Sequence, residues 1–230
     1  MFALSAAESQ AFVLSLQVAG LSAACNLPLA VVLSYLLTRA RFPGRRMLDA
    51  LVHLPLVLPP VAVGYVLLVL FGNRGPIGSW LLTHLGVQLA FTRAGAVLAT
   101  AVMSLPLMVR AMRISLENVD PGLEDAARTL GAGPIDRFLS ITLPLMSPGI
   151  LAGCVTAFAA GLGEFGAVIT FVSNIPGETR TLPLALYTAL QTPDGDAAAG
   201  RLAILSITLG ICGLMLSEYM ARSISKWLGR

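Results

Sequence analysis

The feature that most constrains this chain is a series of long runs without a charged side chain. The stretches from Ser9 to Thr38 and from Ala50 to Asn73 contain no Asp, Glu, Lys or Arg. A helix rises 1.5 Å per residue, so about 20 mainly apolar residues cross the ~30 Å hydrocarbon core of a bilayer. Only 12% of the residues are charged, whereas a soluble domain usually has about 25%. The sequence therefore predicts a protein that crosses a membrane several times.

Five apolar runs predict an all-α, polytopic membrane helix bundle that forms one transmembrane domain over residues 8–225. The expected spans are about 11–38, 50–72, 94–116, 144–172 and 201–221. Two further apolar stretches, 75–92 and 181–193, are interrupted by Gly, Pro and polar residues. We expect both to be interfacial or re-entrant segments on the outer side, although either one would make a sixth span. Prolines within the spans predict kinked or opened helices; these are Pro28, Pro55, Pro59, Pro60 and Pro106.

The basic residues predict the orientation, because cytoplasmic loops of membrane proteins are enriched in Lys and Arg. With five spans, eleven of the fifteen basic residues fall on one side of the membrane. The other side has only Arg74, Arg93, Arg180 and Arg201. We therefore expect a multi-pass protein of the cytoplasmic membrane, with the N-terminus outside and the C-terminus in the cytoplasm.

Motifs for chemistry within this chain are missing from the sequence. It contains no HExxH, no GxSxG and no metal-ligand spacing, and its three scattered cysteines do not form a disulfide framework. The GxGxxG match at residues 161–166 lies in an apolar helical run, where glycines are more typical of close helix packing than of nucleotide binding. We predict no catalytic residue, no metal site and no nucleic-acid binding.

The most informative segment is the loop from Asp120 to Pro144, between the third and fourth expected spans. Asp120 followed by Pro121 is typical of a helix start, with an acceptor at the N-cap and proline in the first turn. Gly131 and Gly133 then predict the end of that helix. The pattern indicates a short helix on the cytoplasmic face, which is either an ordinary amphipathic connector or a surface for another protein.

This segment resembles the EAA loop of ABC-importer permeases, whose pattern is Glu-Ala-Ala, three residues, Gly, nine residues, Ile, any residue, Leu-Pro. Six positions match at the required spacing, namely Ala126, Ala127, Gly131, Ile141, Leu143 and Pro144. At the position of the family's Glu this chain has Asp125, with Glu124 beside it, so either carboxylate is a candidate for the family's contact.

The resemblance implies a coupling helix that docks on a separate ATP-binding subunit. It implies a complex of two such ATPase subunits, a second copy of the permease and an extracytoplasmic binding protein. This chain has no Walker A motif, and its only lysine is Lys226. We therefore expect no cofactor on this chain, and ATP and Mg on the partner ATPase.

Residues 54–68 and 162–191 resemble the molybdate branch of these permeases, and the likeness extends from about residue 8 to 225. It implies import of molybdate or tungstate, with a sulfate or thiosulfate permease as the nearest alternative. An ion-coupled secondary transporter or channel is a more distant alternative, because that class usually has inverted repeats and several intramembrane charges.

A pathway for a transient anion is expected to offer hydroxyls, amides and helix N-termini rather than tight charge pairs, and the candidates for it are Thr156, Thr170, Ser173 and Asn174. Glu164 is the only carboxylate within the apolar interior of an expected span. Because a bare carboxylate would repel a divalent anion, we expect Glu164 to form a structural pair near the outer interface with Arg180 or Arg201. His53 is expected to be a packed or interfacial residue.

Overall fold

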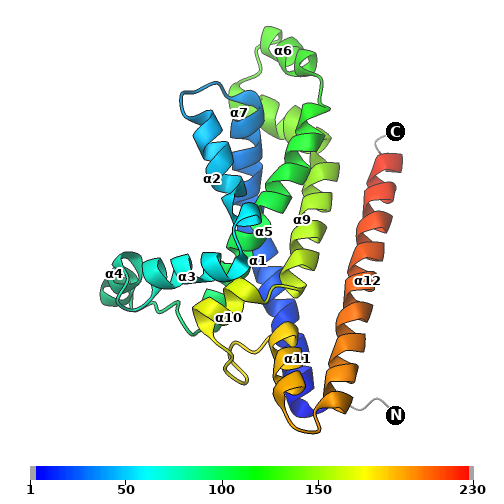
Figure 1. Ribbon diagram of the computed structural model, residues 1–230. Helices are drawn as coiled ribbons and strands as arrows, with labels where there is room; N and C mark the ends of the chain where they lie inside the picture. The colour runs from blue at the N-terminus through cyan, green and yellow to red at the C-terminus, as the bar shows by residue number, and fades with distance from the viewer. Residues whose placement is uncertain (1–3, 228–230) are drawn as a thin grey trace.

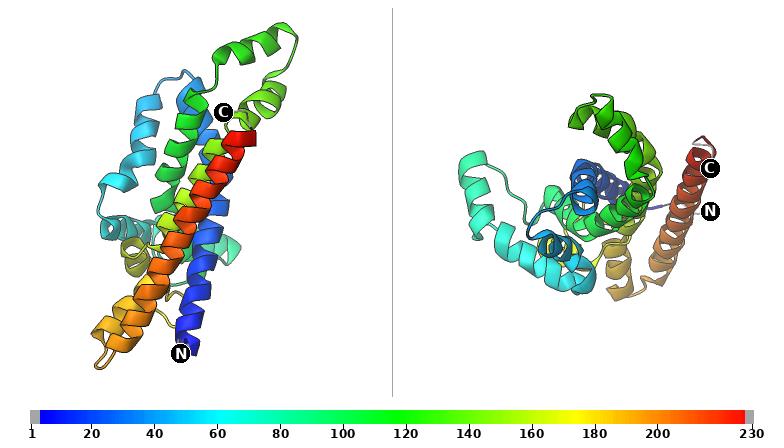
Figure 2. Two further views of the ribbon diagram at one scale, coloured as in Figure 1. Left: turned by 90° about the vertical axis from the view of Figure 1, so that its right-hand side faces the viewer. Right: turned by 90° about the horizontal axis from the view of Figure 1, so that it is seen from above.

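The computed structural model describes residues 4–227, and all the regular elements in that range are helical. The three most extensively packed helices are α1 (Ala6–Arg39), α5 (Arg93–Glu117) and α9 (Ser147–Leu162). They lie side by side along the long axis of the molecule, and α12 (Asp196–Trp227) runs along their flank (Figures 1 and 2). The expected all-α bundle is confirmed.

The helix α1 extends beyond the predicted span 11–38 because a capping box fixes its start. The Ser5 hydroxyl accepts a hydrogen bond from the Glu8 backbone N–H at 3.2 Å, and the Ser5 N–H donates to the Glu8 carboxylate at 2.7 Å. This reciprocal arrangement satisfies two N–H groups that would otherwise have no partner in the first turn. Pro28 lies inside α1 without ending it.

The predicted second span, 50–72, is two helices rather than one. The first, α2 (Arg45–Val57), and the second, α3 (Pro60–Phe71), meet at an angle of 116°. Pro59 and Pro60 cause the break, since neither has a backbone N–H to donate to the preceding turn. As a result α3 lies across the axis of the bundle and leads to α4 (Pro76–Leu85), and together they form an arm (Figure 1).

The predicted fourth span, 144–172, is also discontinuous. It begins in α8 (Leu143–Leu145), which continues α7 (Pro134–Arg137) and the π-helical turn η1 (Phe138–Thr142), and this segment meets α9 at an angle of 65°. A second break at residues 163–165 leads into α10 (Gly166–Val172). The π turn precedes Pro144, which cannot supply the normal helical hydrogen bond.

Three of the described helices are long and apolar enough to cross a membrane, or up to five if each bent pair counts as one span. The three single-helix candidates are α1, α5 and the first part of α12. The count of five is thus the upper limit from length and composition. The helices α4 and α11 (Leu182–Gln191) have ten residues each, or ~15 Å. Each is too short to span by itself.

Different helices lie at the two ends of the molecule. The helix α6 (Pro121–Thr129) and the end of α12 lie at one end, and the start of α1 lies with α11 at the other (Figure 1). Buried clusters fill the interior between them. One joins α1, α3, α5 and α10, a second joins α1, α2, α5 and α9, and a smaller one lies at the α11 end.

Candidate functional site

The short helix predicted after Asp120 is present as α6, with both of its ends fixed by local hydrogen bonds. The Asp120 carboxylate accepts from the Gly122 N–H at 2.8 Å, and Pro121 follows it in the first turn. At the other end the Ala132 N–H donates to the Ala127 carbonyl at 3.0 Å, and Gly131 adopts a φ of +89°. Glycine reaches this left-handed conformation without the steric cost that a Cβ imposes. The helix therefore has a defined length, and it projects from the end of the bundle (Figure 1).

The two neighbouring carboxylates of α6 face different surroundings. The side chain of Glu124 is 17% exposed; it accepts a hydrogen bond from the Thr142 hydroxyl at 2.8 Å and lies 3.6 Å from the Arg39 guanidinium. The side chain of Asp125 is 62% exposed and pairs with Arg128 at 3.2 Å. Glu124 thus connects α6 to the bundle, whereas Asp125 faces outward.

Arg39 joins three elements at this end of the molecule. One of its terminal nitrogens donates to the carbonyl of Val119, just beyond α5, at 2.7 Å and to that of Leu116, in the last turn of α5, at 3.3 Å. The carbonyls that end a helix lack intrahelical partners and have a partial negative charge, which favours a cation there. Together with Glu124, Arg39 connects the ends of α1 and α5 to α6.

The surface around α6 is apolar and exposed. Ala126 and Gly131 are exposed, as are four larger apolar side chains of the same loop, namely Leu123, Leu130, Ile135 and Leu139. Leu130 is 88% exposed and Ile135 is 74% exposed. A projecting group of apolar side chains is typical of a surface that binds another protein.

The second half of the predicted motif belongs to the bundle. Leu143 packs against the buried cluster of α1, α2, α5 and α9, and Ile141 is half-buried. Pro144 is exposed and follows the π turn. The matched residues therefore divide into a part on α6 and at its end, where Ala126 and Gly131 are exposed and Ala127 is half-buried, and a second part in η1 and α8.

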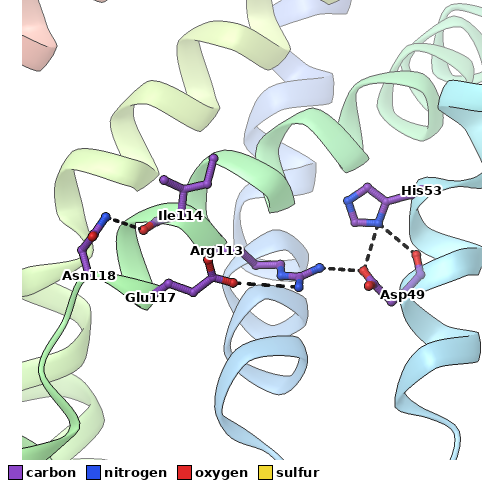
Figure 3. A network of polar contacts seen from close by, with 6 residues as sticks. All are labelled: Asp49, His53, Arg113, Ile114, Glu117 and Asn118. Carbon is purple, nitrogen blue, oxygen red and sulfur yellow. Dashed lines mark hydrogen bonds and ion pairs between the residues drawn. The ribbon is translucent and has the colours of Figure 1, made fainter.

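A second polar network, not anticipated from the sequence, connects α2 to α5 (Figure 3). The Arg113 guanidinium lies 2.6 Å from the Asp49 carboxylate and 4.0 Å from that of Glu117. His53 has its Nδ1 3.1 Å from the Asp49 carboxylate and 2.9 Å from the Asp49 carbonyl oxygen. His53 is half-buried in this network, as expected for a packed residue. Asp49 directly precedes the apolar run of its region, but Arg110 rather than Arg113 is the charge nearest the run in α5, so no local signal predicts this pair.

The four pathway candidates do not share one environment. Thr156 is exposed on α9 and donates to the Ala152 carbonyl at 2.7 Å, while Thr170 on α10 donates to the Gly166 carbonyl at 2.8 Å. Ser173 is exposed just after α10, and its φ is +63°. Asn174 donates from its amide to the Thr188 hydroxyl at 2.7 Å and so connects the loop to α11.

The expected pairing of Glu164 with Arg180 or Arg201 is wrong. Its carboxylate accepts from the Ala167 N–H at 2.9 Å, at the start of α10. Arg201 pairs instead with Glu8 at 2.8 Å, and Arg180 donates to Asn174 at 2.8 Å. The first turn of a helix offers unpaired N–H groups that attract a carboxylate, and these are adjacent to Glu164 in the sequence.

Two of the three glycines in the 161–166 segment lie where helices pack closely, as expected. A Cβ on Gly161 would lie 2.8 Å from the Thr100 methyl carbon of α5, and one on Gly166 would lie 2.7 Å from Pro60 Cβ of α3. Gly163 has no comparable contact. The helices thus approach closely where a side chain is absent.

Within residues 4–227, no three His, Cys, Asp or Glu side chains lie close enough to hold a metal ion. Cys25 and Cys212 are exposed, Cys154 is half-buried, and all three are free. The described part of the chain has the geometry of a helical scaffold with a projecting contact surface.

The sequence matches a known family over most of its length. Residues 26–226 match the family described as "Binding-protein-dependent transport system inner membrane component". The chain is 57% identical over 223 residues to the "Molybdenum transport system permease protein ModB" of Escherichia coli (strain K12), and the match covers 97% of each. It is 39% identical over 186 residues to the "Sulfate transport system permease protein CysT" of the same organism, covering 81% of this chain and 66% of that protein.

A solved structure has a similar fold. A chain of the bacterial alginate ABC transporter, crystallised in complex with alginate pentasaccharide-bound periplasmic protein, superposes with a TM-score of 0.76 at 19% sequence identity. The superposition covers 96% of this chain and 81% of that chain. At this identity the likeness establishes the shared arrangement of helices.

Proposed function

This chain belongs to the family of binding-protein-dependent transport system inner membrane components, and from that membership we propose that it is the permease subunit of an ATP-driven molybdate importer. The observation that carries the proposal is the 57% identity to a molybdenum permease over 97% of both chains. The match to a sulfate permease is lower in identity and in coverage. Molybdate and tungstate are both divalent tetrahedral oxyanions, and either is a substrate of this class.

The exposed surface of α6 supports a role in docking on an ATP-binding subunit. Each of two permease copies presents Leu123, Leu130 and Ile135 to one ATPase subunit, and these side chains lose exposed apolar area on docking. ATP and Mg are bound by that partner. When the two ATPase subunits close, α6 moves with them, and Glu124 and Arg39 transmit the motion to α1 and α5.

The substrate arrives from the opposite end of the molecule. The distribution of basic residues supports a cytoplasmic location for α6 and the C-terminus, and an outer location for the N-terminus and α11. An extracytoplasmic binding protein delivers the anion to that outer end. The bundle then alternates between outward and inward access, and Thr156, Thr170, Ser173 and Asn174 are candidates for transient contacts with the anion.

Uptake of labelled molybdate tests the proposal in cells that express the permease, the ATPase subunit and the binding protein. We expect uptake that requires all three components and that excess unlabelled molybdate or tungstate competes away. Sulfate at the same excess should compete weakly. Uptake that persists without the ATPase would contradict ATP-driven transport, and complete competition by sulfate would favour the sulfate permease.

A further inference from the structure

A small cavity with both polar and apolar lining lies at the end of the molecule opposite α6, where the starts of α1 and α12 meet α11. Its volume is about 200 Å³. Alanines and one leucine form the apolar part of its lining. The polar lining consists of six side chains, namely Ser5, Glu8, Arg180, Thr188, Thr192 and Arg201.

One of the two guanidinium groups in this cavity is held by a carboxylate. Arg201 donates from Nε at 3.1 Å and from Nη2 at 2.8 Å to the same oxygen of Glu8. Glu8 is 5% exposed, and its other oxygen accepts from the Ser5 N–H at 2.7 Å. The pair fixes α12 to the start of α1, and Glu8 neutralises the charge of Arg201.

Arg180 is positioned by neutral groups alone. Its Nε donates to the Asn174 side-chain oxygen at 2.8 Å, and the Asn174 amide donates to the Thr188 hydroxyl at 2.7 Å. Among residues 4–227 no carboxylate lies within ion-pair distance of it, and its two terminal nitrogens make no hydrogen bond. The side chain is thus held in place by its Nε, while its charge has no carboxylate partner and its terminal N–H groups have no acceptor among the described residues.

The cavity therefore has two cations and one anion, which leaves one net positive charge beside several N–H donors. A guanidinium presents its donors in a planar fork that fits two oxygens of a tetrahedral oxyanion, and such charge-assisted bonds are stronger than neutral ones. The single carboxylate is already occupied by Arg201 and Ser5. The net positive charge and the unused N–H donors favour a small divalent anion over a cation.

We propose that this cavity is an outer binding site for a tetrahedral oxyanion, with Arg180 as the residue that contacts it. The inference rests on the proposed function, because the cavity lies at the end that receives the substrate. An anion released by the binding protein meets one uncompensated charge, so it is attracted without being trapped in a fully neutralising site. Asn174 is then a positioning residue that orients Arg180.

Equilibrium binding of labelled molybdate to the purified complex of permease and ATPase, without binding protein, tests the site. We expect saturable binding at up to millimolar molybdate, competed by sulfate but not by chloride. Arg180→Gln should weaken it about tenfold or more, since it removes hydrogen bonds from a charged donor. Arg180→Lys, which keeps the charge but not the fork, should be intermediate.

The matched control is Arg93→Gln, which removes a charge at the same end. Arg93 lies 3.7 Å from Glu178 and does not line this cavity, so we expect wild-type molybdate binding. Equal binding by wild type, Arg180→Gln and Arg93→Gln would overturn the inference, as would an absence of binding to the wild type. An Arg180→Gln effect confined to the affinity for the binding protein would assign Arg180 to a protein contact instead.

Uptake into proteoliposomes containing the complete system separates this inference from the proposed function. If the wild type takes up molybdate and Arg180→Gln does so with an unchanged KM, the oxyanion site is wrong and the function stands. If the wild type takes up no molybdate, the proposed function itself fails. The basal ATPase activity of each variant reports whether the complex has assembled.

Discussion

At the scale of single residues, equal charges in adjacent positions have different roles. Glu124 and Asp125 carry the same charge, but Glu124 alone reaches Arg39 and Thr142. The sequence motif leaves both as candidates for the family's contact, because the choice depends on which side of α6 faces the bundle. That orientation is set by tertiary contacts with α1 and η1.

Neutralising these two carboxylates should therefore have unequal effects. Glu124→Gln leaves the largely buried Arg39 without its carboxylate, at a cost of about 1–3 kcal/mol, and we expect slower transport and a lower thermal midpoint in detergent. Asp125→Asn removes an exposed ion pair worth about 0–1 kcal/mol, so its thermal midpoint should match the wild type. A larger loss of stability in Asp125→Asn would contradict this assignment.

At Gly131 the backbone conformation, rather than a lack of room for a side chain, limits substitution. A Cβ at Gly131 would meet no atom within 4 Å, but φ is +89°. Gly131→Ala should cost about 1 kcal/mol from the left-handed conformation, misorient the end of α6 and weaken binding of the ATPase subunit in a pull-down. Gly133→Ala is the control, because Gly133 is equally unobstructed and has a φ of −69°. Equal effects of the two changes would contradict the role of backbone conformation.

At the scale of elements, glycine determines how closely the helices approach. On α3, a Cβ at Gly64 would lie 2.7 Å from the Ala167 carbonyl oxygen of α10. On α9, one at Gly153 would lie 3.1 Å from Met108 of α5. In a membrane, where apolar association gains little from excluding water, such close backbone contact stabilises helix pairs.

Gly64→Ala should separate α3 from α10, because the obstructing atom belongs to the backbone and cannot rotate away. Overpacking of this kind costs about 1–3 kcal/mol, and we expect a lower midpoint of thermal aggregation for the detergent-solubilised permease. Gly210→Ala, on α12 where a Cβ meets nothing within 4 Å, should leave the midpoint unchanged. A normal midpoint for Gly64→Ala would show that the two helices can separate at little cost.

The elements also show what sequence patterns can and cannot predict. The charge-free runs located α1 and α5, and the Asp120-Pro121 and Gly131 signals located α6, because each of these features is local. Prolines predicted interruptions in the spans but not the 116° corner, since an angle depends on what the two halves pack against. The Glu8–Arg201 pair joins residues separated by most of the chain, and no local signal indicates it.

At the scale of the whole molecule, the orientation in the membrane is open to a direct test. In a background without the native cysteines, Leu130→Cys and Leu190→Cys place exposed thiols at opposite ends; the native side chains are 88% and 65% exposed. In intact cells, a membrane-impermeant maleimide should label position 190 to near completion and position 130 only after the membrane is disrupted. The reverse pattern would place α6 outside and contradict coupling to a cytoplasmic ATPase.

The corner between α2 and α3 limits which motions this protein can use. Two consecutive prolines prevent the pair from straightening into one helix, and the contact of Gly64 with Ala167 joins α3 to α10 almost backbone to backbone. We therefore expect a change in the tilt of α2 to move α3 and α10 together, in a direction across the bundle axis. Any opening that these two helices control is expected to widen laterally rather than by lengthening a helix.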